Sequence, residues 1–250
     1  MKRNKLVLAT LLSGVLFSGI ALAAGDKTTW SYEGDEGPAN WGELSPDYTR
    51  CKSGKNQSPI DINTSKTVKL ADIKFSYNAA PIDVLNNGHT IQVNYAKGST
   101  INVGGKTYQL LQFHFHSPSE HHVNGKPYDM VAHLVHQASD GQLGVIGVMM
   151  KVGKANPVIA SIWNHMPKKA GEHNKITDTV NVADLLPKKH SYFNYSGSLT
   201  TPPCSEGVNW MVLQTPIEVS AEQVASFTSI FAKSVRPVQE VNGRIIHATK

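Results

Sequence analysis

The chain has 250 residues, 17% of them charged, and a formal net charge of +5. Three of the positive charges, Lys2, Arg3 and Lys5, lie within the first 23 residues, which hold no acidic residue, so the remainder carries only about +2. A weakly basic chain without a basic run gives no indication that nucleic acid or an anionic membrane is its partner.

The N-terminus predicts export. The positive residues precede an apolar run from Leu6 to about Leu22, which ends in the small-x-small sequence Ala21-Leu22-Ala23. This pattern is typical of a signal peptide, so we expect residues 1–23 to be removed and the mature chain to begin near Ala24. Because the run is nearly long enough to span a bilayer, a retained anchor is the alternative. Cleavage would leave a periplasmic protein without a membrane segment, with secretion as the other destination.

Two cysteines, Cys51 and Cys204, are present in the chain. In an exported protein such a pair predicts one disulfide. Because its loop would enclose most of the fold, we expect it to stabilise the fold by roughly 2–5 kcal/mol. Two buried free thiols are the alternative.

Residues 24–250 predict a single α+β domain on a large, mostly antiparallel, twisted central sheet with a few short peripheral helices. Ile91 to Tyr95 alternates with a period of two, as strands with one buried face do. The segments Ile101 to Val103 and Thr107 to Leu111 flank a Gly104-Gly105 turn, which is typical of a hairpin. Leu143 to Val152 is nearly continuously apolar, which favours a central strand covered on both faces.

Two helices are expected beside these strands. Asn156 and Pro157 supply an N-cap and a first-position proline for a helix through Met166. Ser220 and Gln223 form a capping box for the second helix. The apolar stripe of that helix consists of Val224, Phe227 and Phe231.

Histidines at strand spacing mark the candidate chemistry. His114 and His116 are two residues apart, so in a strand they share one face, while Phe113 and Phe115 point to the other. A second predicted strand, Met130 to His136, carries His133.

An Asn124-Gly125 turn lies between these two strands. If it closed a regular hairpin, His133 would lie opposite His116. Pro118 and the polar residues around it favour a wider, irregular connection, so we expect neighbouring strands without a fixed register. Three imidazoles on one face can hold a tetrahedral zinc ion and leave its fourth position open. Surface histidines are the alternative for such a pattern.

Several motifs together resemble the alpha-class carbonic anhydrases of the exported bacterial type. They occur in the family's order and extend along nearly the whole mature chain. The matching segments are Asn56 to Ile62, Asn87-Gly88-His89, Gln112 to His121, Ala132 to His136 and Gly197 to Cys204.

The resemblance implies that His114, His116 and His133 hold Zn²⁺, with hydroxide as the fourth ligand. Attack of that hydroxide on CO₂ would give bicarbonate. Three neutral ligands leave the charge of the ion uncompensated, which lowers the pKa of bound water to near 7, a value taken from carbonic anhydrases themselves. Thr200 matches the residue whose hydroxyl accepts the hydroxide proton and donates its own proton to Glu120. Without the resemblance, Thr200 would be a turn residue before two prolines.

The resemblance also implies an apolar wall for CO₂ beside the metal. Val135 lies two residues after His133 and therefore on the same strand face, which supports a cavity position independently. The candidate substrate-binding residues are Val135, Val145, Leu199, Thr200, Thr201, Val208 and Trp210.

His89 matches the proton shuttle of the family. An imidazole with a pKa near 6.5 can accept a proton and pass it to buffer at neutral pH. The polar residues that match those ordering the intervening waters are Tyr32, Asn87 and Gln92, the last being Asn in the better-studied animal enzymes.

The outer hydrogen-bond partners of the ligands depart from the family at one position. Gln112 matches the partner of His114, and His121 and Tyr195 match the residues that usually join the network around the third ligand. The partner of His133 is commonly a glutamate two residues before it, where this chain has Val131.

A second departure concerns His116. Ser234 replaces a usual asparagine, but the family contact to His116 is made through the backbone, so we expect it to be kept.

Three other functions compete with CO₂ hydration. A non-catalytic relative would typically have lost a zinc histidine, and this chain retains all three together with Thr200 and Glu120. A periplasmic zinc carrier would bind metal without hydrating CO₂, and a zinc hydrolase would attack activated esters. A serine hydrolase is disfavoured because the chain has no Gly-x-Ser-x-Gly sequence. We expect CO₂ and bicarbonate as substrates and sulfonamides and anions as inhibitors, and a homodimer is left open.

Overall fold

The structure, a computed structural model, describes residues 29–250. The predicted signal peptide, residues 1–23, lies outside the described residues. In chain order the elements are η1 (Gly34–Glu36), α1 (Trp41–Leu44), η2 (Pro46–Tyr48), α2 (Arg50–Ser53), β1 (Asp61–Ile62), β2 (Lys66–Val68), β3 (Lys74–Ser76), β4 (Ala80–Asn86), β5 (Ile91–Asn94), β6 (Thr100–Val103), β7 (Lys106–His116), β8 (His122–Val123), β9 (Met130–Ala138), β10 (Leu143–Val152), α3 (Pro157–Trp163), β11 (His173–Val180), η3 (Val182–Leu185), β12 (Tyr192–Ser198), β13 (Glu206–Leu213), β14 (Ile217–Val219), α4 (Ala221–Thr228) and β15 (His247–Thr249).

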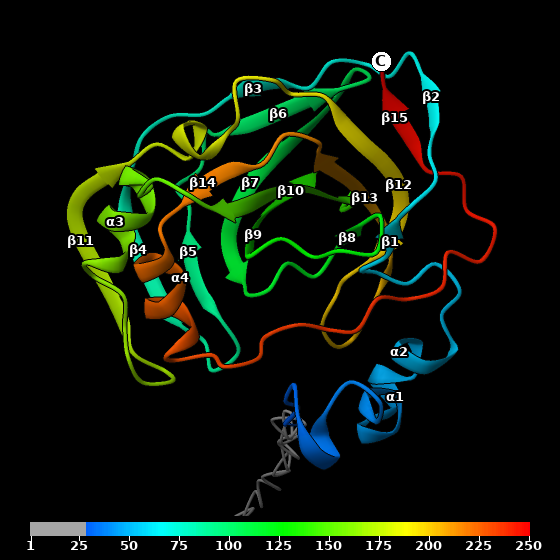
Figure 1. Cartoon of the computed structure of the whole chain (residues 1–250), viewed down its shortest axis with the longest axis horizontal. Coiled ribbons are helices and arrows are strands. Elements are labelled where there is room, and N and C mark those ends of the chain that lie inside the picture. The colour runs from blue at the N-terminus through cyan, green and yellow to red at the C-terminus, as the bar shows by residue number, and fades with distance from the viewer. Residues whose placement is uncertain (1–28) are drawn as a thin grey trace, which may run out of the picture.

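A 13-stranded sheet dominates the fold (Figure 1). Its main path runs β11-β4-β5-β7-β9-β10-β13-β12-β15-β2, with β6 beside β7, β3 beside β6 and β14 beside β10. Most neighbours are antiparallel, whereas β10 pairs in parallel with β13 and β14, and β15 with β2. The prediction of a large, mostly antiparallel sheet with a few short helices is therefore confirmed.

The local turn and cap signals form as predicted. Gly104 and Gly105 have φ of 59° and 83°, the left-handed values that a tight hairpin turn between β6 and β7 requires. The Asn156 side chain accepts hydrogen bonds from two backbone N–H groups of α3, and Ser220 with Gln223 forms the complete capping box of α4.

Helix α3 is shorter than predicted. It ends at Trp163 rather than at Met166. His165 and Met166 continue with backbone bonds to residues three positions earlier, so the last turn tightens. Pro167 follows Met166, and a proline disfavours helical conformation in the residue before it.

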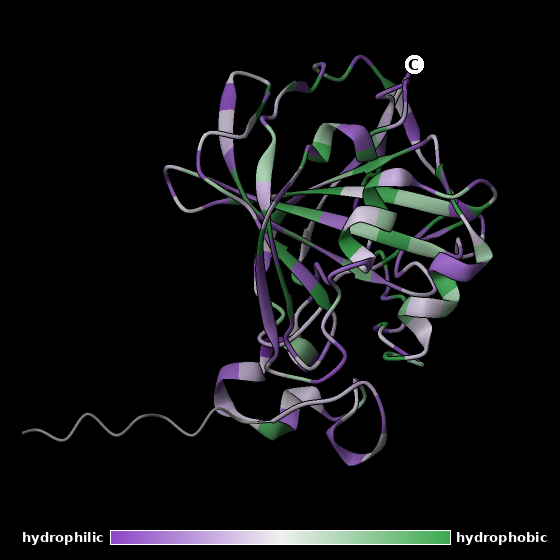
Figure 2. Cartoon of the chain, turned by 90° about the vertical axis from the view of Figure 1, so that its left-hand side faces the viewer, coloured by the Kyte–Doolittle hydropathy of each residue, from purple (hydrophilic) through white to green (hydrophobic). Residues whose placement is uncertain are grey.

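Alternation along the central strands divides the core into two clusters on opposite faces of the sheet. The larger cluster contains Phe113, Phe115 and Leu134, packed with Ile159 from α3 and Phe227 from α4. The residues of the smaller cluster that lie on the central strands are Val131, Val135, Val145, Met149, Val208, Trp210 and Val212. Figure 2 shows the strands through the middle of the molecule as mostly hydrophobic. The odd-numbered positions around His133 thus lie on the side of the smaller cluster.

Strand β7 pairs antiparallel with β9, but the register differs from the hairpin expectation. His133 lies opposite His114, and Val131 lies opposite His116. The Asn124-Gly125 turn closes only a small bridge between Val123 and Lys126. The segment from His116 to Val123 is two residues longer than the segment from Lys126 to Val131. The pairing of β7 with β9 is therefore shifted by two residues from that of a regular hairpin.

Candidate active site and metal centre

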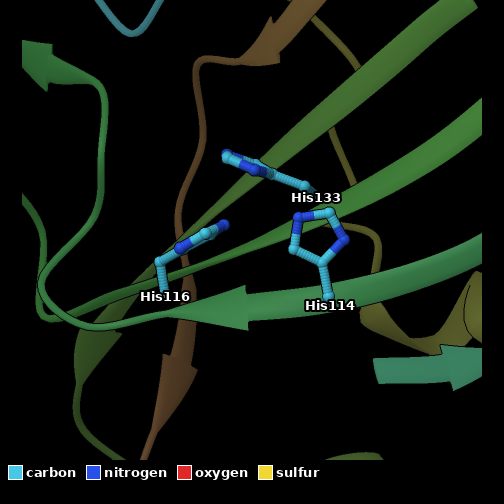
Figure 3. A group of neighbouring side chains, drawn as sticks. All are labelled: His114, His116 and His133. Atoms are coloured by element: carbon cyan, nitrogen blue, oxygen red, sulfur yellow. The ribbon is translucent and has the colours of Figure 1, made fainter. Parts of the chain in front are cut away.

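Three histidines converge at the end of β7 and on the adjacent part of β9 (Figure 3). One ligand nitrogen from each of His114, His116 and His133 lies within 4.8 Å of the other two. Two of the rings are buried and that of His114 is partly exposed. The sheet therefore brings together the residues that the sequence suggested as metal ligands.

Hydrogen bonds orient two of the three rings. His114 Nδ1 donates to Gln112 Oε1 at 2.8 Å, and His116 Nδ1 donates to the backbone carbonyl of Ser234 at 2.5 Å. Since neither oxygen can donate, both imidazoles carry their proton on Nδ1 and keep Nε2 as a free lone pair. The backbone contact expected at Ser234 is thus present.

The third ring is oriented differently. Nδ1 of His133 lies 3.7 Å from Glu120 Oε2, and Nε2 of His116 lies 3.5 Å from the same oxygen. Nδ1 of His133 therefore faces the centre of the cluster. Its Nε2 is buried and has no hydrogen-bond partner among the described residues.

Val131 lies two residues before His133 on β9 and therefore on the same face of the strand. Its side chain is fully buried in the smaller core cluster. The neighbouring His121 donates or accepts through Nε2 with the Tyr195 hydroxyl at 2.6 Å, but its Nδ1 is also buried without a partner. Two buried imidazole nitrogens, one on His121 and one on His133, thus have no hydrogen-bond partner among the described residues.

Burial favours the neutral form of His114 and of His133. It lowers the pKa of His114 and of His133 well below the ordinary histidine value, and the neighbouring His116 lowers both further. Burial likewise lowers the pKa of His121 to about 3. Neutral imidazoles are the form that binds a transition metal, so the donor set fits zinc.

Glu120 is the buried carboxylate beside the cluster. Its Oε1 accepts the backbone N–H of Arg236 at 3.0 Å, and the Thr200 side chain lies close enough to the carboxyl group to lower its pKa. Burial has the largest effect and raises the pKa of Glu120, while His116, Arg236 and Thr200 offset part of this rise. The backbone N–H and the guanidinium of Arg236 are the groups that favour the charged form of this carboxylate.

A cavity of about 120 Å³ lies in front of the histidines. Its walls include His89 and every residue that the sequence suggested for ordering water. The lining residues are Trp30, Tyr32, Asn87, His89, Thr90, Gln92, Gln112, His114, His116 and Thr201. Asn87 donates to Gln92 at 3.4 Å, and the buried Tyr32 hydroxyl has no partner among the described side chains.

His89 lies at the mouth of this cavity. Its ring stacks on Trp30 with the centroids 3.7 Å apart and the planes 8° from parallel. Both rings also border an outer pocket of about 530 Å³. Burial lowers the pKa of the half-buried His89. The stack on Trp30 was not predicted, because no periodic pattern connects a tryptophan with a histidine nearly sixty residues later.

The apolar residues suggested for CO₂ gather beside His133. Val145 pairs with Val135 on one side and with Trp210 on the other. Val208 and Leu199 pack in the same cluster. The Trp210 ring lies 4.9 Å from the His133 ring, centroid to centroid. These residues thus form one wall next to the third histidine.

Cys51 and Cys204 form the predicted disulfide. Cys204 lies four residues after Thr200, so the bond attaches the Thr200 loop to the N-terminal helices. Arg236 reinforces this connection by donating to the Cys51 carbonyl and to Gln57. Sequence reasoning missed Arg236, because a single arginine in an irregular segment carries no pattern. Among the described residues, no helix is both long and apolar enough to cross a membrane.

Comparisons with known proteins agree with the site. The sequence model of the eukaryotic-type carbonic anhydrase family matches residues 36–250. A carbonic anhydrase of Pectobacterium carotovorum is 42% identical over 245 residues, covering 98% of this chain and 99% of the relative. One from Neisseria gonorrhoeae is 44% identical and covers 97% and 96%.

Solved structures show the same similarity. The α-carbonic anhydrase from Thermovibrio ammonificans, in complex with the inhibitor sulfanilamide, superposes with a TM-score of 0.87 at 46% identity and covers 89% of this chain and 100% of its own. The chain therefore belongs to the eukaryotic-type, or alpha, carbonic anhydrase family and is an enzyme of that class.

Proposed function

We propose that this carbonic anhydrase holds a zinc ion through His114, His116 and His133 and catalyses the reversible hydration of CO₂ to bicarbonate and a proton. The observation that carries the proposal is the set of three imidazole nitrogens within 4.8 Å of one another. When bound by three neutral ligands, zinc lowers the pKa of a coordinated water to near 7, a value characteristic of carbonic anhydrases, and so supplies hydroxide at neutral pH.

Thr200 and Glu120 orient the reacting oxygen. Glu120 in its charged form can only accept, so the Thr200 hydroxyl donates its proton to it and keeps a lone pair for the reacting oxygen. A water or hydroxide that donates to this lone pair is fixed in direction, and its own lone pair is free to attack carbon.

The apolar wall receives CO₂. CO₂ has no net dipole and weak acceptors, so a dry surface next to the reactive oxygen suits it better than hydrogen-bond donors do. The residues of this wall are Val135, Val145, Leu199, Val208 and Trp210, and Thr201 lines the cavity in front of the histidines.

His89 carries the proton out. It borders both the inner cavity and the outer pocket, so its ring can accept a proton from water on one side and release it to buffer on the other. The pKa of His89 is lowered by burial, so the neutral, proton-accepting form prevails at pH 7. Tyr32, Asn87 and Gln92 supply polar groups for the intervening waters.

The compartment follows from the N-terminus and the disulfide. We propose that residues 1–23 act as a signal peptide and that residues 24–250 form the periplasmic enzyme. The Cys51–Cys204 bond fits an oxidising compartment. The sulfanilamide complex of the Thermovibrio relative supports sulfonamide binding by this chain as well.

Metal analysis combined with stopped-flow CO₂ hydration tests the proposal. The purified protein is expected to contain one zinc per chain and to lose hydration when a sulfonamide is added. His116→Ala removes a ligand, so zinc content and hydration should fall together. His122→Ala, on the nearby strand β8 and outside the cluster, is the matched control and should keep both. Zinc-loaded protein without hydration would identify a metal carrier instead.

A further inference from the structure

The three ligand histidines differ in what holds their outward nitrogens, and none of the partners is charged. Gln112 offers an amide oxygen to His114, and Ser234 a backbone carbonyl to His116. Nε2 of His133 has no partner among the described residues, and the residue two positions before it on the same face of β9 is the apolar Val131. Ligating histidines in proteins frequently donate to carboxylates, which add negative charge to the metal centre and make the ligand more basic.

Few charges surround this cluster. Glu120 is the carboxylate within 4 Å of the ligand nitrogens. Arg236 offsets it, because its backbone N–H binds Glu120 and its buried guanidinium adds to the local positive potential. Arg244 lies 5.5 Å over the ring of Tyr195, which is hydrogen-bonded to His121. Before any metal binds, the described side chains around the cluster therefore provide no excess negative charge.

We propose that Val131 makes the metal-loaded centre of this chain bind monovalent anions, bicarbonate among them, more tightly than the same centre with a carboxylate at position 131. The inference rests on the proposed function, because it requires the three histidines to hold a divalent metal. In a buried site of low effective dielectric, one missing negative charge near the metal strengthens its attraction for an anion. We expect the difference to be about tenfold in the dissociation constant.

The consequence concerns the end of the reaction. Bicarbonate, the product of hydration, is itself a monovalent anion, so a centre short of negative charge holds its product longer. Chloride and similar ions compete for the same centre. Val131 thus acts as a determinant of anion affinity without touching the substrate.

Thiocyanate binding to the cobalt-substituted protein tests this inference without a measurement of activity. Visible absorption of the cobalt centre reports anion binding directly. Val131→Glu adds an acceptor and a charge, whereas Val131→Gln adds an acceptor of the same size without the charge. Gln137→Glu, at an exposed position of β9, adds the same charge where solvent screens it.

The expected result is a dissociation constant about tenfold higher for Val131→Glu, with Val131→Gln and Gln137→Glu close to the unmodified chain. Equal affinities in all four proteins would overturn the inference, and so would equal weakening by glutamate and glutamine, which would assign the effect to the hydrogen bond. If Val131→Glu folds poorly, the thiocyanate dissociation constant is measured for Val131→Asp, which carries the same charge on a shorter side chain. Failure of the unmodified chain to take up cobalt would instead count against the metal site itself.

Discussion

The disulfide between Cys51 and Cys204 is expected to supply a large share of the stability of the fold. Its two cysteines are separated by 153 positions, so the bond closes a loop around most of the described chain. Replacing both cysteines by alanine removes this constraint from the unfolded chain. It leaves the other contacts of the N-terminal helices, such as the Arg236 bond to the Cys51 carbonyl, in place.

The loop length determines the magnitude. For a loop of 153 residues, the chain-entropy relation gives about 17 cal/mol/K, or about 5 kcal/mol at 25 °C. Disulfides often contribute less than this relation gives, so we expect the double variant to lose about 3–5 kcal/mol of unfolding free energy.

Urea unfolding of the oxidised protein and of Cys51→Ala/Cys204→Ala measures the difference. The midpoint should fall in the variant, and added reductant should destabilise the unmodified protein to a similar extent while leaving the variant unchanged. A loss below about 1 kcal/mol would refute the reasoning, because the crosslink would then have little effect on the conformational entropy of the unfolded chain.

The remaining predictions concern catalysis, metal retention and pH. His89→Ala should slow steady-state hydration about tenfold and recover in imidazole buffer; absence of recovery would point to another proton path. Thr200→Ala should lower kcat/KM about 100-fold while zinc content stays intact, and metal loss would indicate a structural role. Val131→Glu should release zinc to a chelator about tenfold more slowly than the unmodified chain, a magnitude drawn from carbonic anhydrase, and equal rates would contradict the role given to His133. Burial lowers the pKa of His136 from 6.5 to about 4. As the pH falls from 6.5 to 4, the unfolded chain therefore binds a proton at this residue before the folded chain does, and the unfolding free energy should fall by about 3 kcal/mol. In urea unfolding, His136→Gln should lack this fall in stability between pH 6.5 and 4. A variant with the same pH dependence as the unmodified chain would contradict the role given to His136.

Local patterns predicted most of the fold. The Gly104-Gly105 turn, the buried strand Leu143–Val152 and the capping box at Ser220 each depend on residues close together in the chain, and each is present in the structure. Period-two spacing also predicted that His114 and His116 share a face. Such features need no knowledge of distant contacts.

Features that depend on contacts between distant segments were harder to predict from the sequence. The register between His114 and His133 is set by the unequal arms of an irregular connection, and the parallel pairing of β10 with β13 depends on a crossover. The stack of His89 on Trp30 joins segments that share no pattern. The family resemblance suggested the site residues that the structure brings together, but it did not predict this stack or the role of Arg236 beside Glu120.

The effect of Val131 on the metal centre could be inferred only from the sequence and the structure together. The sequence showed that a customary carboxylate is missing, whereas the structure shows that two buried nitrogens, on His121 and His133, are left without a partner. An unsatisfied buried donor costs roughly 1–3 kcal/mol. Because one of the unsatisfied nitrogens belongs to His133, this ligand is the least well held of the three. We therefore expect the bond between the metal and His133 to break most readily.

Removal and return of zinc tests the central proposal most directly. Stopped-flow CO₂ hydration is measured for the purified protein, for the protein after dialysis against a chelator, and after addition of one equivalent of zinc. The proposal predicts that hydration disappears with the metal and returns in proportion to the zinc bound, up to one ion per chain. Hydration that persists in metal-free protein, or that fails to return when the site is filled, would contradict a zinc centre at His114, His116 and His133.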